Sequence, residues 1–226
     1  MDALKLNSLA FARVQESKGI SGSYYFRAVP ESWDDEFIKK VHRLGHEFGY
    51  HYESLTTCNG NLEKAWDDFR NNLDKLRKLA PVTTICMHGS SRSPWDSRDL
   101  WKKYDYWSLG IVSEPYFDID FNKCFYLTDT SQRWDGWRVS VRDKIPQQDE
   151  WVKKGWVFHS TDDIISAANE NRLPNKIMMT FHPQRWTDSF ITWVKIFVLI
   201  TNDILCVSMT GKPEKIKQPE MPLSKR

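Results

Sequence analysis

Residues 62–89, LEKAWDDFRNNLDKLRKLAPVTTICMHG, contain the clearest structural unit of the chain. Apolar residues recur at helical spacing from Leu62 to Leu76, which predicts a long helix with one apolar face. Pro81 follows this helix, and the apolar and β-branched run at 82–89 predicts a strand. Helices that alternate with such strands are typical of parallel sheets.

The same alternation extends toward the N-terminus. Asn7 to Gly19 predicts a short helix with a cap and a stop, and SYYFRAV, residues 23–29, predicts a strand. Residues 34–44 carry apolar side chains at helical spacing. They precede the aromatic stretch GHEFGYHYE, residues 45–53, which predicts the next strand.

Toward the C-terminus the pattern is less regular. CFYLTDT, residues 124–130, and GWVFHS, residues 155–160, are strand-like segments between loops. Thr161 begins another helix, and NKIMMTFHP, residues 175–183, predicts a buried apolar strand. Asp188 is expected to begin a last helix.

The fold class expected from these elements is α/β with a largely parallel sheet. A closed or distorted barrel and an open doubly wound sheet both fit 226 residues. The length and the 40% hydrophobic content favour one compact domain, placed at residues 1–205. Residues 206–226 are polar and contain several Lys and Pro residues, which predicts a disordered C-terminal tail.

No signal peptide or stable membrane insertion is expected. Residues 190–210 are the most apolar, but Lys195 and Asp203 interrupt the run, which favours a buried helix that continues into the tail. The N-terminal residues include charges and lack a small-residue cleavage site after an apolar segment. The four cysteines are far apart and are expected to be reduced, so a cytoplasmic location is predicted.

The composition restricts the class of partner. A net charge of +2, from 32 basic and 30 acidic residues, gives no overall field for nucleic acid. Eleven tryptophans are scattered through the chain, several beside charged residues or proline, as in SPWDSRDLW at 93–101. Aromatic faces next to polar groups suit a carbohydrate substrate, and they equally suit packing at the base of loops. The oligomeric state is not predicted.

Polar residues close several of the expected strands. The carboxyl ends of parallel strands converge on one rim, so residues that are distant in sequence can meet there. Three histidines and two carboxylates can bind a divalent transition metal such as zinc and keep one imidazole as a general acid. This pattern predicts metal-assisted hydrolysis. The strand-end residues are Arg27, His51, Glu53, His88, Asp129 and His182.

His46 and His51 are not expected to share a site. Strand alternation places His51 and Glu53 on one face and His46 on the other. His46 is therefore expected to be structural, as are His42 and His159, because an isolated histidine is more often a hydrogen-bonded packing residue than a ligand.

The stretch FHPQRW, residues 181–186, adds contacts near the last strand end. Proline fixes the chain after His182, and Arg185 and Trp186 then offer a contact for an anion or a sugar.

Together with this stretch, GSYYFR, GHEFGYHYE, PVTTICMHGSSRSPWDSRDLW, EPYFDIDF, YLTDT and VRDKI resemble the polysaccharide deacetylase family, the NodB-homology carbohydrate esterases. The likeness covers roughly residues 2–200 and is to a divergent branch encoded with surface-polysaccharide genes. It implies a distorted or incomplete (β/α) barrel, a divalent metal held by Asp and His, and removal of acetyl from N-acetylated sugars. It also implies that His51 binds the metal and that His182 is the catalytic acid.

Two features depart from the family pattern. The second metal histidine of the family corresponds to Leu55, so Glu53 or His88 is expected to replace it. The family opens with a strand that carries two aspartates, a base and a metal ligand. Only Asp2 remains to match them, so the first strand of the barrel looks absent.

The resulting hypothesis is a zinc-dependent deacetylase acting on an N-acetylated sugar. The alternative is a catalytically inactive carbohydrate-binding or assembly protein that keeps the barrel and its aromatic rim. The expected metal ligands are His51, Glu53, His88 and Asp2, the catalytic residues are His182, Asp129 and Asp2, and the substrate-binding residues are Arg27, Trp95, Arg185 and Trp186.

Overall fold

The computed structural model describes residues 5–30, 32–89, 93–130, 133–138, 145–183, 186, 187, 189, 191 and 194. These residues form a mixed α/β structure with parallel strands in two small sheets, as the sequence predicts. They form no closed barrel. The expected tail at 206–226, the helix start at Asp188 and most of 190–210 lie outside the described residues.

The chain divides into two compact units, with the boundary after Asp118. A single domain over 1–205 stays a prediction. None of the described helices is both long and apolar enough to cross a membrane.

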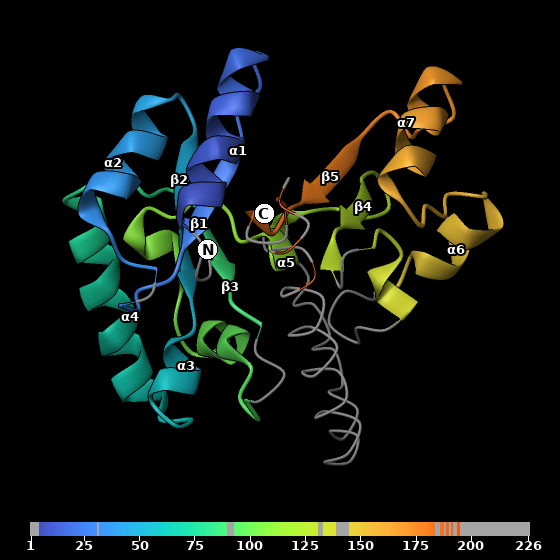
Figure 1. The fold of residues 1–226 in the computed structure, drawn as a ribbon. Helices are drawn as coiled ribbons and strands as arrows, with labels where there is room; N and C mark the ends of the chain where they lie inside the picture. The colour runs from blue at the N-terminus through green and yellow to red at the C-terminus, as the bar shows by residue number, and fades with distance from the viewer. Residues whose placement is uncertain are drawn as a thin grey trace. The chain divides into compact units, whose positions relative to one another are not determined.

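The strands are β1 (Ser23–Phe26), β2 (Glu47–Tyr52), β3 (Ile85–Met87), β4 (Phe125–Thr128) and β5 (Ile177–Thr180). The α-helices are α1 (Lys5–Ser17), α2 (Asp35–Arg43), α3 (Ser54–Thr57), α4 (Leu62–Arg77), α5 (Pro115–Asp118), α6 (Gln148–Lys153) and α7 (Thr161–Asn169) (Figure 1).

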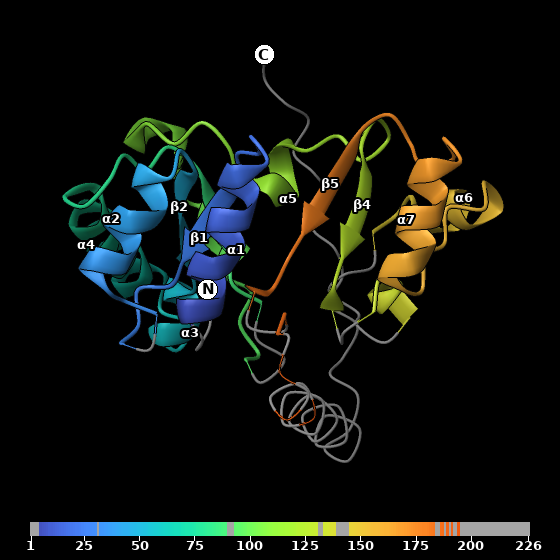
Figure 2. The same cartoon turned by 45° about the horizontal axis from the view of Figure 1, so that its top comes forward.

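The first unit has a three-stranded sheet in the order β1-β2-β3, with an aromatic core on one face. Phe37 of α2 packs against Phe26 of β1 at a ring distance of 5.8 Å, and Phe69 of α4 packs against Tyr50 of β2 at 5.1 Å. Both helices lie on this face of the sheet (Figure 2). Each large apolar side chain buried in this way stabilises the fold by roughly 1.5 to 3 kcal/mol relative to its exposed state.

The opposite face of this sheet is polar. The ring of Tyr25 lies across Gly49, where an added Cβ atom would come within 2.5 Å of it. The absence of a side chain at Gly49 therefore allows the large ring to lie flat beside Glu47 and His51. Strand alternation turns both of these residues away from the aromatic core, as predicted.

The second unit contains the parallel pair β4–β5, with Phe125 opposite Ile177. Two predictions for this unit are wrong. The segment at 155–160 is not a strand, because the backbone N–H groups of His159 and Ser160 donate to the Asp163 carboxylate at the start of α7. β5 is only half-buried, and Met179 is 38% exposed, because β5 pairs with a single strand among the described residues.

A buried carboxyl holds the end of β3 in the first unit. Glu114 is 0% exposed, and it accepts hydrogen bonds from the backbone N–H groups of Met87 at 3.0 Å and Tyr116 at 2.7 Å. The Tyr52 hydroxyl donates a third bond over 3.3 Å. These contacts fix the strand end that leads directly into His88.

The pH dependence of folding provides a first testable prediction. Burial raises the pKa of Glu114 to about 7, although its backbone donors act in the opposite direction. Between pH 4.5 and 7 the folded state then keeps a proton that the unfolded state has lost. The free energy of unfolding should therefore fall as the pH rises, by about 1.4 kcal/mol per unit, and level off above pH 7.

Denaturant unfolding at a series of pH values measures this effect. Glu114→Gln should flatten the dependence in this window, because the glutamine side chain does not titrate. If the free energy of unfolding of the variant depends on pH as steeply as that of the native protein, groups other than Glu114 cause the dependence.

Candidate functional site

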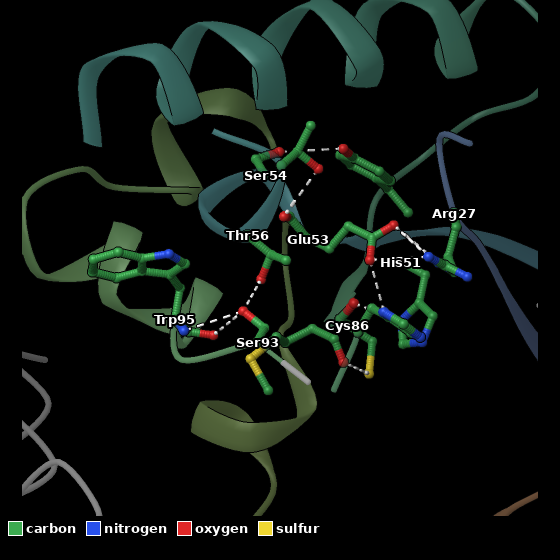
Figure 3. Close-up of polar contacts among 12 residues, drawn as sticks. Arg27, His51, Glu53, Ser54, Thr56, Cys86, Ser93 and Trp95 are labelled. Atoms are coloured by element: carbon green, nitrogen blue, oxygen red, sulfur yellow. Dashed lines mark hydrogen bonds and ion pairs between the residues drawn. The ribbon is translucent and has the colours of Figure 1, made fainter. Parts of the chain in front are cut away.

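Three polar residues follow the strands of the first unit directly: Arg27 after β1, Glu53 after β2 and His88 after β3. The Arg27 guanidinium donates to both Glu53 oxygens, from Nε over 3.0 Å and from Nη2 over 3.1 Å. The His88 ring contacts the same carboxylate over 2.8 Å from Nδ1. Figure 3 shows Arg27 and Glu53 pointing toward one another, with His51 beside them. The predicted convergence of strand ends is confirmed within this unit.

Glu53 is ionised in this arrangement. Burial alone would raise its pKa, but the hydrogen bonds and positive charges of His88 and Arg27 together hold the pKa below its usual value. An ionised carboxylate only accepts hydrogen bonds, so His88 must donate from Nδ1. In the neutral ring the lone pair then lies on Nε2.

His51 is held in the same tautomer. Its Nδ1 lies 2.8 Å from the carbonyl oxygen of Cys86, its register partner on β3, and a carbonyl can only accept. The rings of His51 and His88 are 5.0 Å apart at an angle of 80°. Two neighbouring imidazoles thus carry their lone pairs on Nε2.

These two rings fit part of a zinc site. Zinc binds imidazole nitrogen at about 2.0 to 2.1 Å, so two rings on one tetrahedral ion have centres roughly 5 Å apart. An Nδ1–H bonded to a carbonyl or a carboxylate is the usual support for a histidine ligand. Glu53 fits this supporting role better than that of a direct ligand, because both its oxygens already accept hydrogen bonds.

A complete metal site is not present in the described part of the chain. No three His, Cys, Asp or Glu side chains gather there in an arrangement that would hold an ion. Asp2, the remaining expected ligand, lies outside the described residues. Leu55, which the sequence resemblance sets against a second metal histidine, is 3% exposed and belongs to the aromatic core.

His46 is structural, as predicted. It is 2% exposed on the core face of β2. Its Nε2 donates to the Ala12 carbonyl over 2.9 Å, and its Nδ1 accepts from the Gly22 N–H over 3.2 Å. Both ring nitrogens therefore tie α1 and the start of β1 to the beginning of β2.

Trp95 is set apart from the Arg27–Glu53 pair. Its ring covers Gly60, where an added Cβ atom would lie within 2.6 Å of the indole. Ser93 fixes the adjoining backbone and contacts the Thr56 hydroxyl at 2.8 Å. Figure 3 shows Trp95 beyond Thr56 and Ser93 as seen from Arg27. The ring is 43% exposed, so it combines packing on Gly60 with an accessible surface.

A cavity of about 390 Å³ in the first unit was not predicted. Trp33 lines it together with Pro30, Asn72 and Lys75, and Ala28, the residue after Arg27, also belongs to its wall. The indole N–H of Trp33 donates to Asp35 over 2.8 Å, which fixes the ring. The sequence shows the tryptophan, but the partners from α4 become apparent only in the fold.

In the second unit the expected catalytic residues meet. The Nδ1 of His182 lies 2.5 Å from Asp129, which follows β4 directly, and the His182 backbone N–H donates to both carboxylate oxygens. The indole N–H of Trp186 donates to Asp129 over 2.7 Å. Asp129 therefore fixes both the position and the tautomer of His182. Arg185 lies outside the described residues.

The charge of Asp129 suits this role. Burial opposes its ionisation, but the hydrogen bonds and charge of His182, with the Trp186 indole, hold its pKa below the usual value. An ionised aspartate behind Nδ1 stabilises the imidazolium that forms when Nε2 takes up a proton. The pair can therefore hold a proton at Nε2 and deliver it to a leaving group.

A second His–Asp pair in this unit was not predicted. His159 Nδ1 lies 2.7 Å from Asp135, whose side chain is 0% exposed, and Arg133 donates to the same carboxylate over 2.8 Å. His159 itself is 56% exposed. A signal was present in the sequence, since VFHS at 157–160 contains the dipeptide Phe-His, as TFHP at 180–183 does.

No protein-family model, no curated protein and no solved structure matches the chain.

Proposed function

We propose that the protein is a metal-dependent hydrolase that removes acetyl from an N-acetylated sugar in surface-polysaccharide biosynthesis. The observation that carries the proposal is the pair His51 and His88, side by side and each held at Nδ1 by an acceptor. This is the arrangement that metal-binding histidines require. The finer fold hypothesis, a distorted or incomplete (β/α) barrel of the polysaccharide deacetylase type, belongs to the same proposal.

In this proposal the metal is zinc, which would be held through Nε2 of His51 and His88, and Asp2 is kept for the general base. When bound, a divalent ion lowers the pKa of water and polarises a carbonyl. Glu53 keeps the His88 ring oriented and, through Arg27, remains ionised.

In this proposal His182 is the general acid, as the likeness to the deacetylase family implies. His182 protonates the leaving amine from Nε2, while Asp129 stabilises the positive charge on its ring. Asp129 is engaged by His182 and Trp186, so we assign the general base to Asp2 in preference to Asp129.

Carbohydrate as the substrate is supported by the cavity that Ala28, the residue after Arg27, helps to line. Its wall combines the indole of Trp33 with the amide of Asn72 and the ammonium of Lys75, the groups that suit the face and the hydroxyls of a sugar. The accessible indoles of Trp95 and Trp186 offer further stacking surfaces.

The thiols of Cys58, Cys86 and Cys124 are free, which supports a cytoplasmic location.

Metal analysis together with an acetate-release assay tests the proposal. The purified full-length protein should release acetate from chito-oligosaccharide or UDP-N-acetylglucosamine after zinc, cobalt or nickel is added. Chelator should abolish the release, and added metal should restore it. A protein that binds no metal and releases no acetate would contradict the proposal.

Two observations favour the alternative of an inactive carbohydrate-binding protein. Leu55 is a core residue, and both oxygens of Glu53 are engaged by Arg27 and His88. This alternative predicts that a sugar quenches tryptophan fluorescence equally with and without chelator, and that no acetate appears. Chelator-sensitive turnover would exclude it.

A further inference from the structure

A small cavity in the second unit lies at the amino ends of β4 and β5, whereas Asp129 and His182 follow their carboxyl ends. Its volume is about 190 Å³. Its wall comes from the turn before β4, from α6 with the residues after it, and from the residues before β5. It is therefore separate from the His182 site and belongs to a single compact unit.

The charged residues of this wall are mostly basic. Lys123, Lys154 and Lys176 are balanced by Glu150 alone, which gives the lining a formal charge of +2. Lys123 also pairs with Asp120 over 3.3 Å, so Lys154 and Lys176 are the main candidates for anion binding. Lysine binds phosphate as a point charge.

An amide of fixed orientation forms one side of the wall. Asn122 donates to Asp120 over 3.0 Å, which turns its amide oxygen toward Gln147, and the Gln147 amide nitrogen donates to that oxygen over 3.0 Å. The orientation of the Gln147 amide is thereby fixed. Its oxygen is buried, so a ligand in the cavity does not reach it, and the amide shapes the wall without contacting the ligand.

The size and the remaining wall restrict the ligand further. The volume of about 190 Å³ is on the scale of one sugar ring with a phosphate group and is too small for a nucleotide. Trp151 and Trp156 supply an aromatic wall, and the Lys154 ammonium lies 5.1 Å from the Trp156 ring centre.

We propose that this cavity binds the phosphate monoester of a single sugar. The phosphate, with a charge of about −1.5 to −2, matches the +2 lining better than a carboxylate does. The sugar ring lies against the indole wall of Trp151 and Trp156. This site does not depend on the proposed deacetylation.

Isothermal titration of the full-length protein with glucose 6-phosphate, inorganic phosphate and glucose tests this inference. Saturable binding of glucose 6-phosphate, tighter than that of either fragment, is the expected result. Lys154→Gln and Lys176→Gln should each weaken it by about tenfold or more, because a charged hydrogen bond is lost. Lys153→Gln, the same charge change at the neighbouring residue outside the lining, should alter it less than about twofold.

Absence of saturable binding by the native protein would overturn the proposal, as would an equal loss in Lys153→Gln. Equal affinities for the sugar phosphate and inorganic phosphate would overturn the sugar part. Thermal melts of each variant verify that it is folded.

Discussion

Replacing His182 by alanine is expected to lower the rate of acetate release by about 10²- to 10⁴-fold, the contribution of a positioned general acid. Nε2 is the atom that carries the transferred proton, because Asp129 holds Nδ1 as the donor of its own hydrogen bond. The loss should fall on kcat and leave KM nearly unchanged, since the ring acts on the leaving group in the transition state.

Two further variants test the role of Asp129. Asp129→Asn removes the charge that stabilises the imidazolium, so kcat should fall and its pH profile should shift. Trp186→Phe keeps an aromatic ring but deletes the 2.7 Å bond to Asp129, so a smaller loss is expected.

The control for these measurements is His159→Ala. It removes the ring of the other His–Asp pair, which is 56% exposed and bonded to Asp135. Activity should be retained. A loss as large as that of His182→Ala would show that the acid was assigned to the wrong pair.

The elements that were predictable are those whose signals are local. Helical spacing of apolar residues predicted α2 and α4, and both begin at side-chain caps that the sequence displays, Asp34 and Asn61. Strand alternation placed His46 and His51 on opposite faces because side-chain direction in a strand depends only on position. Convergence of Arg27, Glu53 and His88 followed from the parallel order of their strands.

Two features could not be predicted from the sequence, the structure of residues 155–160 and the role of Glu53. The first depends on competition between local structures and the second on side-chain geometry. Residues 155–160 have the composition of a strand, but the capping box of Ser160 and Asp163 takes the backbone N–H groups that a sheet would need. Glu53 was expected to bind the metal directly. Its pairing with Arg27 depends on the register of neighbouring strands, which composition and spacing do not specify.

Replacing His51 by alanine should lower zinc affinity by 10- to 100-fold or more, since even the loss of a supporting residue has an effect of that size. The free energy of unfolding without metal should change little, by about 1 kcal/mol. The ring is only partly buried, and the Nδ1 bond to the Cys86 carbonyl has a modest net worth.

His46→Ala should do the reverse, although His46 lies directly before β2 and His51 lies within it. It leaves the Ala12 carbonyl and the Gly22 N–H without the partner that joined them, at a cost of about 1 to 3 kcal/mol in stability. Zinc binding should persist, because His46 faces the aromatic core and His51 faces the polar side of the sheet. Calorimetric zinc titration and denaturant unfolding in chelator distinguish the two variants. Equal loss of zinc from both would mean that the metal does not bind at the His51 face.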